Sequence, residues 1–162
     1  MKFSVIIPCF NELQSLPNLI KMLLSLQVEY DLEYILVENG SSDQSKDFFK
    51  KKIENKFTNV KVVYIDKNIG YGYGLQRGLE VASGDYIGWA HADLQTPLID
   101  FFKLYLRIKD KKNIFGKGFR INNRGFDGVI SRIHEKLASF ILGYQMNEIN
   151  ALMNMYMKSG ET

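Results

Sequence analysis

The segment His91-Ala92-Asp93-Leu94-Gln95 places an imidazole, a carboxylate and an amide at alternate positions. Mg²⁺ and Mn²⁺ prefer oxygen ligands in an octahedral shell that substrate phosphates and water often complete. One or two carboxylates together with a diphosphate are therefore enough, and we interpret the segment as a candidate site for a metal ion and a diphosphate. The alternative interpretation makes His91 a partly buried structural histidine and Asp93 the N-cap of the following helix.

Two other polar segments carry groups that could bind a nucleoside. Pro8-Cys9-Phe10-Asn11-Glu12 offers a ring, an amide and a carboxylate, and Glu38-Asn39-Gly40-Ser41-Ser42-Asp43 offers several acceptors. Such groups could receive hydrogen bonds from a base and from ribose hydroxyls. Taken alone, each segment is more simply explained by asparagine and aspartate residues that form turns and cap helices.

A glycine-rich segment, Asn68-Ile69-Gly70-Tyr71-Gly72-Tyr73-Gly74, precedes an expected helix. Backbone N–H groups in such a loop can approach a phosphate near a helix N-terminus. The segment lacks the Gly-Lys-Ser/Thr element of a Walker A loop. It also follows the third expected strand, whereas a dinucleotide-binding fingerprint follows the first. A tightly packed loop is an equally good explanation.

The elements around these segments alternate between short apolar runs and amphipathic ones. We expect strands at 3–7, 34–37, 60–65, 86–90, 114–119 and 149–157. We expect helices at 16–26, 41–53, 75–82, 98–108 and 129–142, with Ser41, Ser42 and Asp43 capping the second and Ser83-Gly84 closing the third. This alternation predicts an α/β domain with a mostly parallel sheet. Ligands of such sheets bind beyond the carboxyl ends of the strands, where the four segments fall.

Composition narrows the class of protein further. The chain has 162 residues, of which 46% are hydrophobic, and this suits one folded domain with a real core. A single cysteine, Cys9, excludes an internal disulfide and favours a reducing, cytoplasmic environment. The net charge of +3 is too small to indicate nucleic acid as a partner. No apolar run is long enough to predict a membrane span, and the N-terminus does not have the pattern of a signal peptide.

Taken together and in order, the four segments, with Gly78 and Gly84-Asp85-Tyr86, resemble family 2 glycosyltransferases. The resemblance is greatest to the branch of polyprenyl-phosphate (dolichyl-phosphate) mannose and glucose synthases, densely over residues 3–98 and loosely over 115–157. It implies a GT-A fold, a UDP- or GDP-sugar donor, a Mn²⁺ or Mg²⁺ cofactor, and transfer with inversion to a lipid phosphate (polyprenyl phosphate) or polysaccharide. It further implies one glycosyltransferase domain over 1–162, with a nucleotide-sugar half at 1–98 and part of an acceptor half at 99–162, so that we expect a truncated chain.

The resemblance also implies roles for individual residues. The metal ligands would be Asp93, Gln95 and His91, and Asp93, Arg120 and Arg132 would be catalytic, since the arginines belong to two motifs that contact donor or acceptor phosphates. The nucleotide would be held by Pro8, Phe10, Glu12, Glu38, Asn39, Asp43, Asn68, Gly70 and Ala92.

Three positions depart from the pattern of the branch. His91 replaces the first aspartate of Asp-X-Asp, Glu38-Asn39 replaces a pair of aspartates, and Glu148-Ile149-Asn150-Ala151 stands where an aspartate is usual. No catalytic base is therefore assigned. These departures leave open a nucleotide-sugar-binding or assembly module without turnover. A nucleotidyltransferase is a weaker alternative, because the basic glycine-rich loop expected near the N-terminus is replaced by Pro8–Glu12.

Membrane contact is the last expectation from the sequence. The helix expected at 129–142 is amphipathic, which suits a core helix or one that lies at a bilayer surface near a lipid acceptor. Lysines at 50–52 and 109–112 suit solvated helix ends or attraction to anionic lipid. The predicted location is the cytoplasm, at the inner face of the cytoplasmic membrane.

Overall fold

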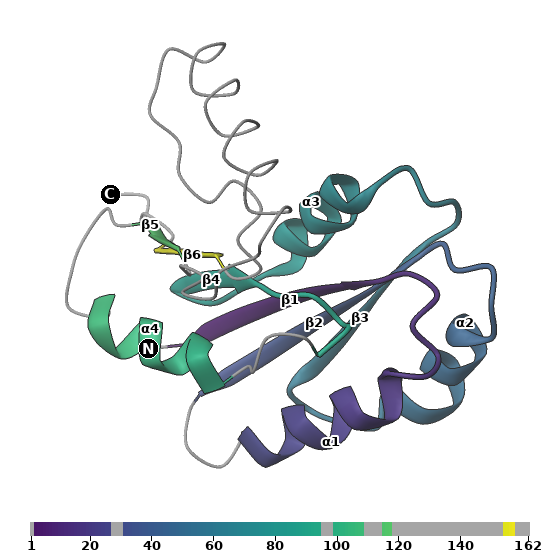
Figure 1. The fold of residues 1–162 in the computed structure, drawn as a ribbon, viewed down its shortest axis with the longest axis horizontal. Coiled ribbons are helices and arrows are strands. Elements are labelled where there is room, and N and C mark those ends of the chain that lie inside the picture. Colours follow the sequence, from purple (N-terminus) through teal and green to yellow (C-terminus); the bar gives the residue numbers. More distant parts are fainter. Residues whose placement is uncertain (1, 27–30, 95–98, 109–114, 118–153, 158–162) are drawn as a thin grey trace, which may run out of the picture.

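A computed structural model describes residues 2–26, 31–94, 99–108, 115–117 and 154–157. Their strands form one six-stranded sheet in the order β3-β2-β1-β4-β6-β5 (Figure 1). The strands are β1 (Phe3–Cys9), β2 (Leu32–Asn39), β3 (Val60–Ile65), β4 (Tyr86–Trp89), β5 (Phe115–Lys117) and β6 (Asn154–Met157). The first four strands are parallel, and β6 runs antiparallel to both β4 and β5. The predicted mostly parallel α/β sheet is confirmed.

Helices cover both faces of this sheet. They are α1 (Leu16–Leu26), α2 (Ser45–Phe48), the π-helical turn η1 (Phe49–Ile53), α3 (Tyr71–Val81) and α4 (Ile99–Ile108). Along β2, Tyr34 and Leu36 join one buried cluster with residues of α1 and η1, whereas Ile35 and Val37 join a second cluster against α3. This period of two is that of a strand buried on both faces. Figure 1 shows α1 and α3 on opposite sides of the sheet.

Several predicted boundaries are wrong. β2 extends beyond the predicted 34–37 at both ends. The prediction was short because glutamates usually mark the solvent-exposed end of a strand, whereas Glu33 and Glu38 are buried within this one. Helix α3 begins at Tyr71 rather than near residue 75, so the second half of the glycine-rich segment is helical. It ends at Val81 with Ala82 extended, and Ser83-Gly84 therefore does not close it.

The helix predicted at 41–53 begins at Ser45 and changes to a π-helical turn at Phe49. Ser41 and Ser42 lie before it and do not cap it. The Asp43 carboxylate accepts a hydrogen bond from the Ser45 N–H at 2.8 Å, so this one member of the predicted cap contributes to the start of the helix. The helix predicted at 129–142 lies outside the described residues.

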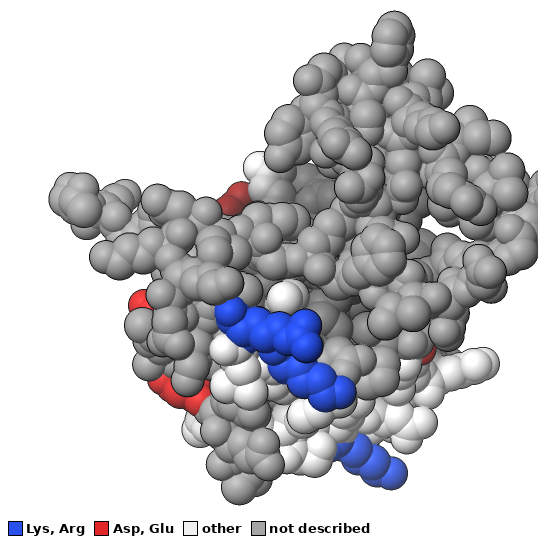
Figure 2. All heavy atoms as spheres, turned by 60° about the vertical axis from the view of Figure 1, so that its left-hand side comes forward, with Lys and Arg blue, Asp and Glu red and all other residues white. Residues whose placement is uncertain are grey.

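Charge on the described surface is mixed. Figure 2 shows basic side chains among acidic and uncharged ones on the side that carries the N-terminus and α4 in Figure 1. None of the helices in the described ranges is long and apolar enough to cross a membrane.

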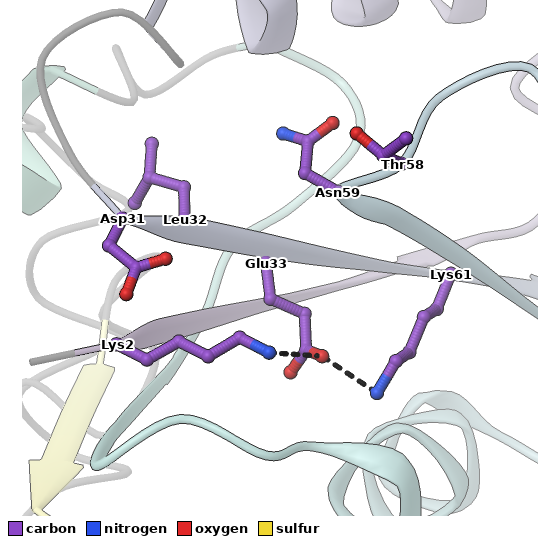
Figure 3. A pocket seen from close by; sticks show the side chains of 7 residues that line it. All are labelled: Lys2, Asp31, Leu32, Glu33, Thr58, Asn59 and Lys61. Atoms are coloured by element: carbon purple, nitrogen blue, oxygen red, sulfur yellow. Dashed lines mark hydrogen bonds and ion pairs between the residues drawn. The ribbon is translucent and has the colours of Figure 1, made fainter.

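The amino ends of the strands hold a buried carboxylate, that of Glu33. Lys2 and Lys61 place their ammonium groups 3.2 and 2.7 Å from its Oε1 atom (Figure 3). Ser4 donates its hydroxyl to Oε2 at 2.6 Å, and Ser83 donates from its backbone N–H and its hydroxyl at 2.9 and 2.8 Å. Burial alone raises the pKa of Glu33, but the hydrogen bonds from Lys61, Ser4 and Ser83 outweigh it and hold this pKa well below its usual range. Glu33 is therefore a charged, fully bonded structural group.

Candidate functional site

The topology brings the four polar segments to one edge of the sheet. Parallel pairing sets Cys9 beside Glu38 and Asn39 beside Ile65, so β1, β2 and β3 end close together. Strand β4 runs parallel to β1 as its other neighbour and ends at the same edge (Figure 1). The segments that follow these strands lie at the edge where α/β proteins bind ligands.

Asn11 connects the first two segments. Its backbone has a left-handed φ of 57°. Its side-chain oxygen accepts hydrogen bonds from the N–H of Ser42 at 2.8 Å and of Asp43 at 3.3 Å, and its own N–H donates to the Ser41 hydroxyl at 3.1 Å. Asp43 is also engaged, since it accepts from the N–H groups of Ser45 and Leu13. Hydrogen bonds hold the Asp43 pKa below its usual value against the opposing effect of burial. The interpretation of Asn11 and Asp43 as turn-forming residues is thus supported.

The other residues of the first segment present different surfaces. Pro8 is buried within β1, whereas Phe10 is 43% exposed at the strand end. Glu12 is half-buried, and its carboxylate accepts a hydrogen bond from the Ser15 hydroxyl. Cys9 is buried and donates its thiol to the Ile7 carbonyl at 3.3 Å. Burial raises the Cys9 pKa, so this thiol stays protonated and unreactive. Phe10 therefore provides the exposed apolar surface of this segment.

Glu38 and Asn39 end β2 with acceptors that the described residues do not satisfy. One Glu38 oxygen, Oε1, accepts from the Ser41 N–H at 2.7 Å, and the Asn39 amide donates to the Gly70 carbonyl at 3.3 Å. Within the described chain, Glu38 Oε2 and Asn39 Oδ1 are buried without a hydrogen-bond partner. Buried acceptors of this kind are rare and need an explanation.

Gly40 fits β2 to the glycine-rich loop. It has a φ of 71°, and a Cβ at this position would lie 2.4 Å from the backbone nitrogen of Asn68. Only glycine allows this approach. Asn68 in turn accepts from the Gly70 N–H at 2.8 Å, and α3 starts at the next residue, Tyr71. The β2 and β3 loops therefore form one packed unit.

The segment after β4 contains the candidate metal ligands. His91 and Asp93 are half-buried and Ala92 is buried. The His91 ring stacks on the Tyr71 ring, with centroids 4.8 Å apart and planes within 6° of parallel. Partial burial raises the Tyr71 pKa and the nearby Asp93 charge raises it further, so the phenol stays neutral. The residue after Asp93, Leu94, has a left-handed φ of 61°, so no helix starts directly after Asp93 and its interpretation as an N-cap is not supported.

The donor set fits a cation only in part. Among the described residues no three histidine, cysteine, aspartate or glutamate side chains lie close enough to hold a metal ion. One carboxylate and one imidazole suit an ion that a diphosphate and water coordinate at its other positions. Gln95, Arg120 and Arg132, which complete the predicted metal and catalytic sets, lie outside the described residues.

Sequence reasoning missed two features of this edge. The first is Tyr71, which the glycine-rich spacing attributed to a loop. The second is a hollow of about 520 Å³ bordered by the end of β3, the loop after it and α3, and lined by Tyr64, Ile65, Asp66, Lys67, Ile69, Tyr73 and Arg77. The aromatic residues between the glycines were the signal available for both.

Comparison with known proteins identifies this α/β class. Residues 4–159 match the sequence description "Glycosyl transferase family 2", and the chain belongs to that family. The resemblance stated from the four segments is confirmed.

The chain is similar to curated transferases that are about twice its length. The chain is 30% identical over 159 residues to the undecaprenyl-phosphate 4-deoxy-4-formamido-L-arabinose transferase of Serratia proteamaculans, covering 96% of this chain and 48% of that protein. It spans about half the length of the curated relatives it matches.

Two solved structures confirm the fold. TarS of S. aureus, solved with UDP-GlcNAc, is 27% identical with a TM-score of 0.52 over 66% of this chain and 32% of TarS. Glucosyl-3-phosphoglycerate synthase of Mycobacterium tuberculosis, solved with Mn²⁺, UDP and phosphoglyceric acid, is 19% identical with a TM-score of 0.68 over 96% of this chain and 55% of that one. The predicted GT-A fold is thereby confirmed.

Proposed function

We propose that this chain transfers a sugar from a UDP- or GDP-sugar to a lipid-phosphate or polysaccharide acceptor. The observation that carries the proposal is the meeting of four polar strand-end segments at one edge of a family 2 sheet. The TarS structure named above contains a UDP-sugar, and the S. proteamaculans relative is named for an undecaprenyl-phosphate acceptor. These names support a UDP-sugar as the donor and a lipid phosphate as the acceptor.

The donor nucleotide would lie over the ends of β1, β2 and β3. The exposed Phe10 ring can stack on a base, and the buried acceptors of Glu38 and Asn39 suit N–H or O–H donors of the nucleoside. Glu12 and Asp43, whose carboxylates accept hydrogen bonds from neighbouring residues, would shape this end of the site together with the buried Pro8. The backbone at Asn68, Gly70 and Ala92 would border the diphosphate.

The leaving diphosphate would lie at the end of β4. Asp93, with His91 and Gln95 beside it, would hold a Mn²⁺ or Mg²⁺ ion, which when bound neutralises charge on the leaving group. Arg120 and Arg132 would hold donor or acceptor phosphates. An acceptor oxygen would attack the anomeric carbon, the bond from that carbon to the diphosphate oxygen would break, and the nucleoside diphosphate would leave with the electron pair. A phosphate oxygen attacks as an anion, whereas a hydroxyl acceptor would give its proton to a carboxylate. The configuration is inverted.

Donor binding and acceptor binding would fall to different parts of the chain. Residues 1–98 would bind the donor and 99–162 would form part of the acceptor half. With a polyprenyl-phosphate acceptor, the protein would work as a peripheral protein at the cytoplasmic face of the membrane, and nucleic acid would not be a partner.

A thermal-shift panel of UDP- and GDP-sugars, with and without Mn²⁺, tests the donor class. A ligand that binds only the folded chain raises the unfolding midpoint. One donor class should raise it in the presence of Mn²⁺. If no nucleotide sugar moves the midpoint, the proposal fails.

A binding module without turnover is the second candidate. It is favoured by the histidine in the metal segment and by the small donor set within the described residues. Slow, Mn²⁺-dependent release of free sugar from the donor supports the enzyme. Donor binding without any release supports the module.

A further inference from the structure

Two rings from different loops lie face to face at the proposed donor site. Tyr71 starts α3 directly after Gly70, and His91 follows the end of β4. Their ring centroids are 4.8 Å apart and their planes differ by 6°. The stack therefore joins the glycine-rich loop to the segment that carries Asp93.

We propose that Tyr71 is a positioning residue that holds the imidazole of His91 in one orientation beside Asp93. The inference rests on the proposed function, because it matters only where this segment holds a diphosphate. Stacked aromatic pairs stabilise one another beyond the area they bury. Both imidazole nitrogens bond in the plane of the ring, so a stack that fixes this plane also fixes the plane in which they can bond. The stack thus limits the directions in which His91 can meet a donor or a metal ion.

The ring of Tyr71, rather than its hydroxyl, performs this role. The contact is between the two ring faces, with centroids 4.8 Å apart, so the ring alone supplies it. Phenylalanine at this position keeps the ring and should keep the function. Leucine keeps an apolar side chain of similar reach and removes the ring, so it should lose the function.

The stack can be tested without any change at Tyr71. The chain has two histidines, and the His91 signals in a proton NMR spectrum are those that disappear in His91→Ala. In the unaltered chain we expect nuclear Overhauser effects between the His91 and Tyr71 ring protons, and His91 signals shifted upfield by the Tyr71 ring. Absence of both effects in the folded chain overturns the inference.

Binding of UDP and GDP in the presence of Mn²⁺, measured by calorimetry, tests the consequence. Tyr71→Leu should lower the affinity of the nucleotide that binds by about twofold to tenfold, the range expected for one stacked pair. Tyr71→Phe should bind the nucleotide with the affinity of the unaltered chain. Tyr73→Leu is the matched control, since both tyrosines are 37% exposed and lie in the same turn of α3.

The outcomes separate the two proposals. If the unaltered chain binds nucleotide and Tyr71→Leu binds it equally well, Tyr71 has no positioning role and the proposed function stands. If the unaltered chain binds no nucleotide, the proposed function fails, while the NMR measurement still decides whether the stack exists. An equal loss in Tyr73→Leu would show a general effect of the helix and would also overturn the inference.

Discussion

A buried glutamate lies near each end of strand β2, and the two differ in how completely the chain satisfies their carboxylate oxygens. Glu33 and Glu38 are both glutamates, lie in the same strand and are almost completely buried. At the amino end, two lysines and two serines bond both oxygens of Glu33. At the carboxyl end, Glu38 bonds one backbone N–H and buries its second oxygen without a partner among the described residues.

This difference indicates which glutamate stabilises the sheet and which lies where a ligand would bind. A charged group whose hydrogen bonds all come from the chain stabilises the fold. Acceptors left over in a buried position cost stability unless something else satisfies them. The Asn59 side chain, just before β3, is also buried without a partner among the described residues, so the contrast concerns the two glutamates and not every group at the two ends. We infer that Glu33 is structural and that Glu38 belongs to the end of the sheet that binds a ligand. The following variants test that contrast, from the largest expected effect to the smallest.

Asp93→Asn should abolish Mn²⁺-dependent nucleotide binding at the carboxyl end. An amide keeps the size of the side chain and removes the negative charge that a divalent ion needs. We expect an affinity loss of at least a hundredfold, about 2.7 kcal/mol, in calorimetric titrations with UDP or GDP. Unchanged affinity in the presence of Mn²⁺ would show that Asp93 has no part in the site.

Glu33→Gln and Glu38→Gln form a matched pair for stability. The amide nitrogen that Glu33→Gln introduces would face donors of Ser4 and Ser83, and we expect a loss of about 2 kcal/mol in unfolding free energy from urea titration. The lysine contribution is small because both side chains are well exposed. Glu38→Gln keeps the acceptor for Ser41 and should cost less than about 1 kcal/mol. The reverse order would remove the contrast between the two ends.

Gly84→Ala and Gly40→Ala compare two close approaches of the backbone. An added Cβ would meet the Ser4 nitrogen at 2.6 Å in the first variant and the Asn68 nitrogen at 2.4 Å in the second. Each should lower stability by about 1–2 kcal/mol. Only Gly40→Ala displaces the glycine-rich loop, so it alone should weaken nucleotide binding, by a few fold. Equal weakening by both variants would argue that the loss comes from the fold and not from the loop.

The smallest expected effect is the pH dependence of the stabilisation that Glu33 provides at the amino end. The folded pKa of Glu33 is lowered, so its stabilising effect is complete above its unfolded pKa of about 4.3 and is lost as the pH falls from there toward the folded pKa. The difference in stability between the unaltered chain and Glu33→Gln should be constant from neutral pH down to about pH 5 and then narrow. A difference that widens in acid would mean that Glu33 does not carry its charge in the fold.

The sequence predicted the sheet and its ligand edge better than the details at either end. Apolar periodicity located β1, β3, β4, α1 and α4 to within a few residues, because each buries a regular stripe. It placed β2 correctly but two residues short at each end, where two buried glutamates lie. The Glu33 contacts require the register of Ser4 with Glu33, and local patterning does not contain that register.

The candidate site shows the same limit. Strand order correctly placed His91 and Asp93 directly after β4, and their roles at a metal ion stay predictions. The stack of Tyr71 on His91 could not be predicted, since it depends on where α3 starts and on how two loops meet. The roles of Gln95, Arg120 and Arg132 stay predictions.

The position of β6 has a consequence for how the chain is made. Among the described strands this one lies furthest along the sequence, yet it pairs with both β4 and β5 in the interior of the sheet. During synthesis, β1 to β4 emerge from the ribosome first, and the outer side of β4 has to wait for residues 154–157. An unpaired strand edge of this kind readily pairs with other chains. Until residues 154–157 pair with β4, pairing of this open strand with other chains competes with folding of the nascent protein.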